Sequence, residues 1–388
     1  MSSFVSSRDV AEASRPSGAP RHLRATGSTG GAARQAPRYT WLDSAKGLGI
    51  VLVVLGHAST SGVVNTSLYA FHMPLFFIIS GLLFKARPLG ETVARKARRF
   101  LVPYLVFALL TFAYWALVER RFRPGEYSVV SAFANIFLAR GGIQNNPYNV
   151  VLWFLPCLFV TEMAFACVVA ILRRVTGGFR HLLSAGVTVM VFVAFVLGYL
   201  MTQMVPDVPE GRLPFTLDIV PFAFGFYAIG YLAKPSLPRF DALTGKPLWR
   251  GVLAVTSVLL FAVMVVIVRA SSLRVDLNSD VATSVPLLVV TALLGTTAML
   301  LLCIGVDNPL LRYLGGASLA IMCAHDPIKR VAIVLVAKVL GLTTEVARTT
   351  PLALALIVAL TIAVSLFMYE LVRRVAPQAL GTVPMGNE

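Results

Sequence analysis

The sequence predicts an all-α protein that crosses a membrane about ten times. The 388-residue chain is 57% hydrophobic and only 13% charged, with a mean hydropathy of +0.78. This composition is typical of polytopic membrane proteins. Its apolar runs each approach the roughly 20 residues that a bilayer crossing needs. Its basic residues fall in short clusters between those runs, which indicates cytosolic loops.

The N-terminal segment differs from the rest of the chain. Residues 1–38 are rich in Ser, Ala, Gly, Pro and Arg and have no apolar run, so we expect a disordered basic segment. It lacks the apolar centre of a cleavable signal peptide, and the first membrane helix is expected to act as the targeting signal. Residues 39–375 then form one integral-membrane domain, followed by a cytoplasmic tail at 376–388.

The ten expected spans are separated mostly by short connections. The first two are joined by an uncharged turn that contains Ser, Thr and Asn. The spans lie at about 46–64, 68–85, 100–118, 150–172, 182–204, 214–233, 251–269, 283–304, 317–341 and 351–372.

The distribution of basic residues sets the expected orientation. With a cytosolic N-terminus, the cytosolic segments hold 23 of the 34 Lys and Arg residues, so both termini are predicted to be cytoplasmic. A multi-pass protein of the inner (plasma) membrane, in contact with its lipids, is the expectation. The net charge of +16 does not indicate nucleic-acid binding, because the basic residues do not gather on one face. The four cysteines lie within apolar spans and imply no disulfide framework.

Two loops on the outer side are candidates for contact with an external ligand. The longest runs from Glu119 to Asn149 and contains RRFRPGEYS, an amphipathic stretch, and GGIQNNPYN. The other, SSLRVDLNSD, joins spans seven and eight. The chain shows no internal repeat of the kind that builds many transporters in two halves.

The stretch from Trp41 to Phe84 holds two histidines within a short apolar hairpin. His57 is expected inside the first span, and His72 is expected to open the second. An ionisable side chain inside a membrane helix is costly and is a functional hypothesis by default. This hairpin is therefore the first candidate for a reactive site. Ser80 and Gly81 are better explained by close helix packing than by nucleophilic attack.

Asp43, Lys46 and His57 form a geometric set on the first helix. Lys46 and His57 are 11 residues apart, which places them about 20° apart around the helix and about 16 Å apart along it. One helix face is thus expected to connect a cytosolic cation to an imidazole in the membrane. The plain alternative is that Asp43 caps the helix, Lys46 sets topology and His57 bonds a neighbouring helix.

A second buried group lies late in the chain, where His325 and Asp326 fall well inside the ninth span. Such a pair is expensive enough to suggest a role. Adjacent residues point about 100° apart on a helix, so these two are not themselves a catalytic dyad. Because no helix shows paired ligand spacing for zinc, no metal site is expected.

Several motifs together resemble the membrane acyltransferase-3 family, in particular its fucose 4-O-acetylase-like and exopolysaccharide O-acetyltransferase branch. The resemblance covers about residues 39–375. Its motifs are LDxxKG with a basic residue before His57, FHMPLFFIISGLLF, RKARRFLVPYLVF, LWFLPCLF and LGGASLAIMCAHDPI. Many members carry Arg where this chain has Lys46, and Lys lacks the planar fork with which Arg grips a phosphate.

This resemblance implies transfer of an acetyl group from cytosolic acetyl-CoA to a sugar hydroxyl on a surface or exported glycan. His57 is the expected general base, with Asp43 and His72 assigned to the catalytic site beside it. Whether the acetyl group moves directly from the thioester or through an acyl-enzyme stays open. The sequence favours no oligomeric state. Donor binding is assigned to Lys46, Arg95, Arg98 and Arg99, although such cations also serve as ordinary topology signals. Further candidates by likeness are Trp153, Ser318 and His325.

Two other functions fit the composition. A proton-coupled transporter of a glycan or lipid precursor could use buried His57 and His325 as relay groups. The missing repeat and the scarcity of carboxylates within the spans speak against it. A membrane scaffold without activity would tolerate replacement of His57.

Overall fold

The computed structural model describes residues 39–122, 127–205, 212–244, 246–277 and 281–381. The predicted basic segment 1–38 and residues 382–388 of the predicted tail lie outside the described residues. Within them the regular secondary structure is helical apart from one short antiparallel pair, β1 (Val275–Asp276) with β2 (Val281–Ala282), in which Val275 lies opposite Ala282.

The helices before the longest loop are α1 (Thr40–Ala58), α2 (Gly62–Tyr69), α3 (His72–Leu82), α4 (Leu89–Lys96), η1 (Ala97–Leu101), α5 (Val102–Tyr114), η2 (Trp115–Glu119) and α6 (Arg120–Phe122). Those in the middle of the chain are α7 (Val129–Leu138), η3 (Val150–Trp153), α8 (Phe154–Val175), α9 (Arg180–Met204), η4 (Pro214–Thr216), α10 (Val220–Ala233), η5 (Lys234–Ser236) and α11 (Leu237–Asp241). The last are α12 (Pro247–Ala270), α13 (Val285–Gly305), α14 (Pro309–Leu340), α15 (Thr344–Ala347), α16 (Pro351–Val375) and η7 (Pro377–Leu380).

Among the described residues, nine helical stretches are long and apolar enough to cross a membrane. They are 40–58, 62–82, 89–122, 150–175, 180–204, 214–241, 247–270, 285–305 and 351–375. The all-α, membrane-spanning prediction is confirmed. The ninth of the ten predicted spans corresponds to α14, a 32-residue helix that carries six Lys, Arg, His or Asp side chains and therefore falls outside the apolar set.

The predicted start of the first span was wrong by about six residues. The span was expected at 46–64, whereas α1 begins at Thr40 and ends at Ala58. Polar residues continue into its first turns because they have partners: Thr40 and Ser44 donate hydrogen bonds to Asp307, at 2.6 and 2.7 Å. His57 consequently lies in the last turn of α1 rather than near its middle.

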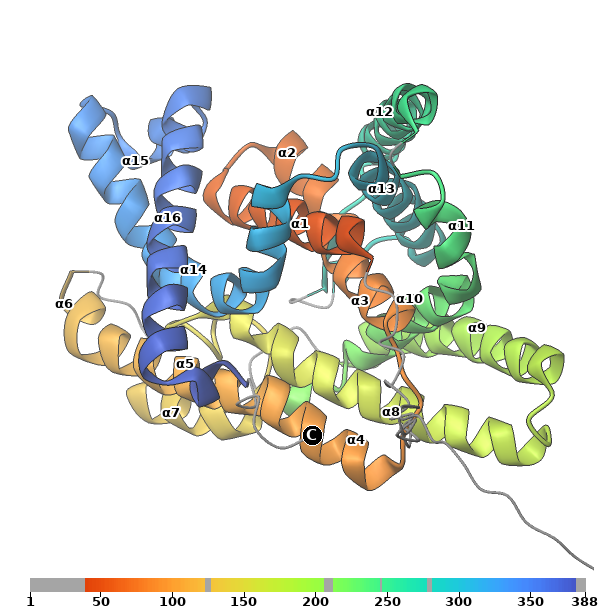
Figure 1. Cartoon of the computed structure of the whole chain (residues 1–388). Helices are drawn as coiled ribbons and strands as arrows, with labels where there is room; N and C mark the ends of the chain where they lie inside the picture. Colours follow the sequence, from red (N-terminus) through yellow and green to blue (C-terminus); the bar gives the residue numbers. More distant parts are fainter. Residues whose placement is uncertain (1–38, 123–126, 206–211, 245, 278–280, 382–388) are drawn as a thin grey trace, which may run out of the picture. The chain divides into compact units, whose positions relative to one another are not determined.

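Helix α1 is packed among other helices, with α14 its main neighbour and α13 and α16 beside it. Figure 1 shows α14, α15 and α16 together in blue, with α1 in red nearby. Two glycines permit the close approach of α1 to α14. A Cβ at Gly47 would lie 1.9 Å from the Leu311 carbonyl oxygen, and one at Gly315 would lie 1.9 Å from that of Asp43. This crossing fixes which residues of α14 face α1.

Helix α10 packs against α3, α8 and α9 and closes the other side of α3. A Cβ at Gly81 would lie 1.9 Å from the Tyr227 carbonyl oxygen on α10. The predicted packing role of Gly81 is therefore confirmed. Buried aromatic rings, among them Phe77, Phe165 and Phe222, fill the space between these helices.

Candidate active site

Three histidines from distant parts of the sequence meet where α1 ends, α3 begins and α14 passes. The ring centroid of His57 lies 5.5 Å from that of His325 and 6.5 Å from that of His72. Tyr69 adds a fourth ring, 5.8 Å from His57. His72 and His325 are almost fully buried, whereas His57 is half-buried. The sequence singled out all three histidines, and the structure brings them together.

Backbone hydrogen bonds define the protonation of two of these rings. Nδ1 of His72 lies 2.6 Å from the Leu68 carbonyl oxygen, and Nδ1 of His325 lies 3.0 Å from the carbonyl oxygens of Ile321 and Met322. A carbonyl oxygen only accepts, so each Nδ1 carries its proton and each Nε2 is left as an acceptor in the neutral ring. Nε2 of His325 is buried and has no hydrogen-bond partner among the described residues. That nitrogen is an unused acceptor close to His57.

His57 opens onto a cavity of about 850 Å³. Helices α1, η2 and α14, the loop before η3, and the segment around α15 enclose it. Its aromatic lining comes from Trp115 and Tyr127. Its charged lining residues are Glu119, Asp326, Lys329, Arg330, Glu345 and Arg348. A concave site with convergent polar groups is the usual form of a small-molecule site.

The charges on the cavity wall are organised by two ion pairs at Asp326. One carboxylate oxygen lies 2.7 Å from Lys329 Nζ and the other 2.5 Å from an Arg330 nitrogen. Arg330 also contacts Glu119 on η2, at 2.7 and 2.9 Å, and donates to the Pro147 carbonyl oxygen at 3.1 Å. These contacts join α14, η2 and the loop between α7 and η3 into one wall.

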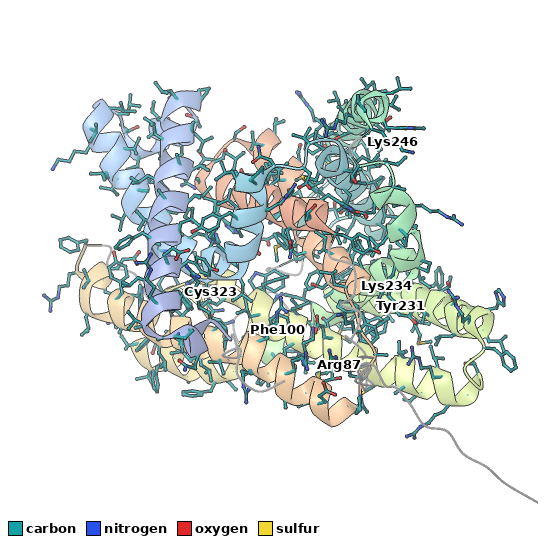
Figure 2. All side chains as sticks on the ribbon, in the orientation of Figure 1. Arg87, Phe100, Tyr231, Lys234, Lys246 and Cys323 are labelled. Atoms are coloured by element: carbon teal, nitrogen blue, oxygen red, sulfur yellow. The ribbon has the colours of Figure 1, made fainter. Side chains whose placement is uncertain are left out.

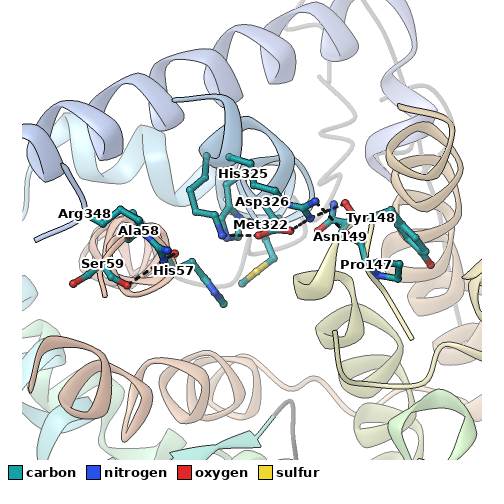
Figure 3. Close-up of polar contacts among 12 residues, drawn as sticks. His57, Ala58, Ser59, Pro147, Tyr148, Asn149, Met322, His325, Asp326 and Arg348 are labelled. Carbon is teal, nitrogen blue, oxygen red and sulfur yellow. Dashed lines mark hydrogen bonds and ion pairs between the residues drawn. The ribbon is translucent and has the colours of Figure 1, made fainter. Parts of the chain in front are cut away.

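The proline within α14 explains a further contact with that loop. Pro327 has no N–H, so the carbonyl of Cys323, four residues earlier, lacks its usual helical donor. Asn149 supplies one, with its side-chain nitrogen 2.7 Å from the Cys323 oxygen. Figure 3 shows Asn149 and Tyr148 beside this part of α14.

Burial raises the pKa of Tyr148, and its neutral hydroxyl donates to Asn146 at 3.1 Å.

Arg348 holds the end of α1 that carries His57. Its Nε donates to the Ala58 carbonyl oxygen at 2.8 Å, and its terminal nitrogen lies 3.5 Å from the His57 and Ser59 oxygens. Figure 3 shows Arg348 at the end of this helix. A cation there satisfies carbonyls that have no helical donor and suits the negative end of the helix dipole. It also fixes the backbone from which His57 projects.

The structure does not bring Asp43 to the histidines. Asp43 lies 14 residues before His57 on one helix, which corresponds to about 21 Å along the axis. Its carboxylate pairs with Lys46 at 2.6 Å. Both residues thus belong to the first turns of α1, near the Thr40 and Ser44 hydrogen bonds to Asp307.

The predicted donor-binding arginines lie on one basic segment made of α4 and η1, with Arg95 on α4 and Arg98 and Arg99 in η1. Arg95 pairs with Glu91 at 3.0 Å, and Arg98 and Arg99 are exposed. This basic segment is anchored by Lys96, which lies 2.5 Å from the buried carboxylate of Glu162 on α8. Figure 2 labels Phe100 within this segment and Arg87 just before it. It is separate from the His57 cavity.

The two remaining candidates lie outside the cavity wall. Trp153 is buried at the end of η3, directly before α8, with its ring edge-on to that of Phe154 at a centroid distance of 6.2 Å. Ser318 donates to the Gly315 carbonyl oxygen within α14, at 2.8 Å. It lies about two turns before His325.

Sequence reasoning did not single out Glu119, Lys329, Arg330 or Arg348. In the sequence the first of these begins a predicted loop, and the basic residues resemble ordinary cations near span ends. The pairing of Arg330 with Glu119 joins residues 211 positions apart, which no local pattern indicates. The closeness of Lys329 and Arg330 to Asp326, at spacings of three and four, was the one available signal.

No group of three or more His, Cys, Asp or Glu side chains within the described residues could hold a metal ion. The four cysteines are free, and three of them are buried.

Comparison with known proteins gives one match. The family model described as an acyltransferase domain, that of the membrane acyltransferase-3 family, matches residues 39–370. No curated protein and no solved structure matches the chain.

Proposed function

The chain belongs to the membrane acyltransferase-3 family, and on this premise we propose that it is an O-acetyltransferase acting on a surface or exported polysaccharide, or on its lipid-linked precursor. The donor is cytosolic acetyl-CoA and the acceptor is a sugar hydroxyl. The observation that carries the proposal is the half-buried His57 ring, which lines a cavity close to a ring nitrogen of His325 that has no partner in the described part of the chain.

His57 supplies the base. A sugar hydroxyl attacks a thioester slowly until a group accepts its proton, and a neutral imidazole is well suited to that near pH 7. His57 is the histidine of the cluster that lines the cavity. Its ring accepts the hydroxyl proton as the oxygen bonds to the acetyl carbon. When the carbon–sulfur bond breaks, the same proton passes from His57 to the departing sulfur.

His325 orients the base. Its Nδ1 proton is committed to backbone carbonyls, so its Nε2 is free to accept the N–H of the neighbouring His57 ring. When the His57 ring turns to donate that hydrogen bond, its other nitrogen is left as the acceptor that faces the substrate. The arrangement follows the common plan in which a base is itself held by a third group.

The donor and acceptor parts of the site lie toward opposite ends of α1. In the expected orientation the first turns of α1 and the Arg95–Arg99 segment face the cytosol, where cations attract the phosphates of acetyl-CoA. The thioester at the end of its long flexible arm then reaches His57, about 16 Å along α1 from Lys46. The cavity around His57 takes the acceptor from the outer side.

The lining of the cavity suits a sugar. Trp115 and Tyr127 contribute aromatic rings to the lining, and Glu119 and Glu345 contribute carboxylates, which accept hydrogen bonds from hydroxyl groups. The transporter alternative has no comparable support, because the family match is to acyltransferases.

The test is a donor-consumption assay with purified protein in lipid nanodiscs. Acetyl-CoA and a glycan extracted from the host are supplied together, and free CoA and glycan-bound acetyl are measured. The proposal expects both products in equal amounts, with little CoA release when the glycan is left out. Transport of glycan without CoA release would contradict it.

A further inference from the structure

The cavity wall holds a cation that the proposed base chemistry does not use. Lys329 lines the cavity with His57, and its side chain is only 11% exposed. It lies four residues after His325 on α14, and residues at this spacing share one face of a helix. The ring centroids of His57 and His325 are 5.5 Å apart, so His57 lies close to the part of α14 that carries Lys329. The base and the Lys329 ammonium therefore border the same space.

The ion pair with Asp326 does not use all of the hydrogen-bond donors of Lys329. An ammonium carries three N–H donors, and within the described residues Lys329 makes one hydrogen bond, to Asp326 Oδ1 at 2.7 Å. The other oxygen of Asp326 is held by Arg330 at 2.5 Å, so the carboxylate has a second cationic partner. Asp326 therefore fixes the position of the Lys329 ammonium and leaves donors for a ligand in the cavity.

The proposed reaction develops a negative charge in this space. When the sugar oxygen bonds to the acetyl carbon, the π electron pair moves onto the carbonyl oxygen, and the hydroxyl proton moves to His57. The tetrahedral intermediate then regains its C=O bond as the C–S bond breaks. A fixed donor aimed at such an oxyanion in a site shielded from water is worth about 10²–10³ in kcat.

Resting on the proposed function, we propose that Lys329 is a catalytic residue that stabilises this oxyanion. Lys329 keeps all of its protons throughout, and Asp326 and Arg330 hold it in place. Two other roles are distinguishable from this one. Lys329 could serve only as the ion-pair partner of Asp326, or it could bind an anionic group of a substrate in the ground state.

The experiment compares Lys329→Met with Lys338→Met, which makes the same change at an exposed position on the same helix. Donor and acceptor are titrated in the nanodisc assay. We expect Lys329→Met to lower kcat by about 10²–10³-fold with little change in either KM, the pattern of an interaction made only in the transition state. Lys338→Met should match the wild type. Lys329→Gln retains a donor to Asp326 without the charge and should also lose at least about tenfold in kcat.

Three results would overturn the proposal. One is a kcat for Lys329→Met or Lys329→Gln within about threefold of the wild type, where about 10²–10³-fold is expected. Another is a raised KM with unchanged kcat, which would indicate ground-state binding. The third is recovery of kcat in the double variant Asp326→Asn/Lys329→Met, which would make Lys329 a partner of Asp326 only. Absence of CoA release by the wild type would instead refute the proposed function itself.

Discussion

The two ends of α1 hold their polar groups in different ways. In the first turns, Thr40 and Ser44 donate to Asp307, and Lys46 pairs with Asp43. In the last turn, the His57 ring faces a cavity, and the nearest ring of α14 has a nitrogen without a partner among the described residues. A polar group in a membrane helix is costly unless it is paired. The paired end is explained as an anchor, whereas the open end is where we propose that the substrates bind.

The largest expected effect on stability comes from disrupting the packing at the paired end of α1. In Gly315→Ala, the new Cβ would lie 1.9 Å from the backbone oxygen of Asp43, and α1 must move to admit it. Overpacking of this kind typically costs about 1–3 kcal/mol or more. We expect a clear drop in the thermal unfolding temperature and in the yield of monodisperse protein. Gly316→Ala is the control, because nothing lies within 4 Å of a Cβ there. Equal unfolding temperatures for the two variants would disprove this packing argument.

The next effect concerns the open end. His325→Ala removes the acceptor that orients His57, and we expect kcat to fall at least tenfold, toward the roughly 10²–10⁴-fold typical of a lost general base. The pH dependence of kcat should change as well, and because truncating a buried ring leaves a cavity, the unfolding temperature is measured beside it to separate lost activity from lost stability. Ser318→Ala is the control on the same helix, since that hydroxyl bonds only its own backbone among the contacts described. An unchanged pH profile and kcat in His325→Ala would mean that His325 does not act through His57.

A smaller effect is expected in the pH dependence of stability, through Asp307 at the paired end of α1. Burial opposes the charged form of Asp307, but hydrogen bonds from Arg312 and two hydroxyl groups outweigh it and hold the pKa of Asp307 below its usual value. The folded pKa is therefore lower than the unfolded pKa of about 3.9, so the pairing stabilises the protein above that pH. This stability is lost as pH falls through the folded pKa. Unfolding temperatures measured between pH 3 and 6 should show this loss in the wild type and a smaller one in Asp307→Asn. Parallel curves would contradict the assignment.

The smallest effect is expected at Lys46. A cation near the start of α1 attracts a donor phosphate without touching the reacting carbonyl, so Lys46→Gln should raise the KM for acetyl-CoA and leave kcat almost unchanged. Lys46→Arg keeps the charge and should retain most activity. Titration of acetyl-CoA checks both. An unchanged KM in Lys46→Gln would assign Lys46 to its pair with Asp43 and to topology alone.

Local sequence patterns predicted the spans and the separate histidines. Span-length apolar runs and the cost of ionisable groups in membrane helices were enough to select His57, His72 and His325. The start of α1 was misplaced because Thr40 and Ser44 are polar, and their partner Asp307 lies more than 260 residues away in the chain. For the same reason no local pattern indicated that Arg330 pairs with Glu119. Contacts between distant segments determine which charges are satisfied, and a local pattern does not contain them.

The central claim is that acyl transfer depends on the His57 ring at the cavity. The most direct measurement is kcat for glycan acetylation by His57→Ala in nanodiscs, beside His181→Ala, which changes an exposed histidine on α9. Loss of a general base costs about 10²–10⁴-fold. We predict a loss of that size for His57→Ala, with normal expression and unfolding temperature, and wild-type activity for His181→Ala. Near-normal acetylation by His57→Ala would contradict the claim.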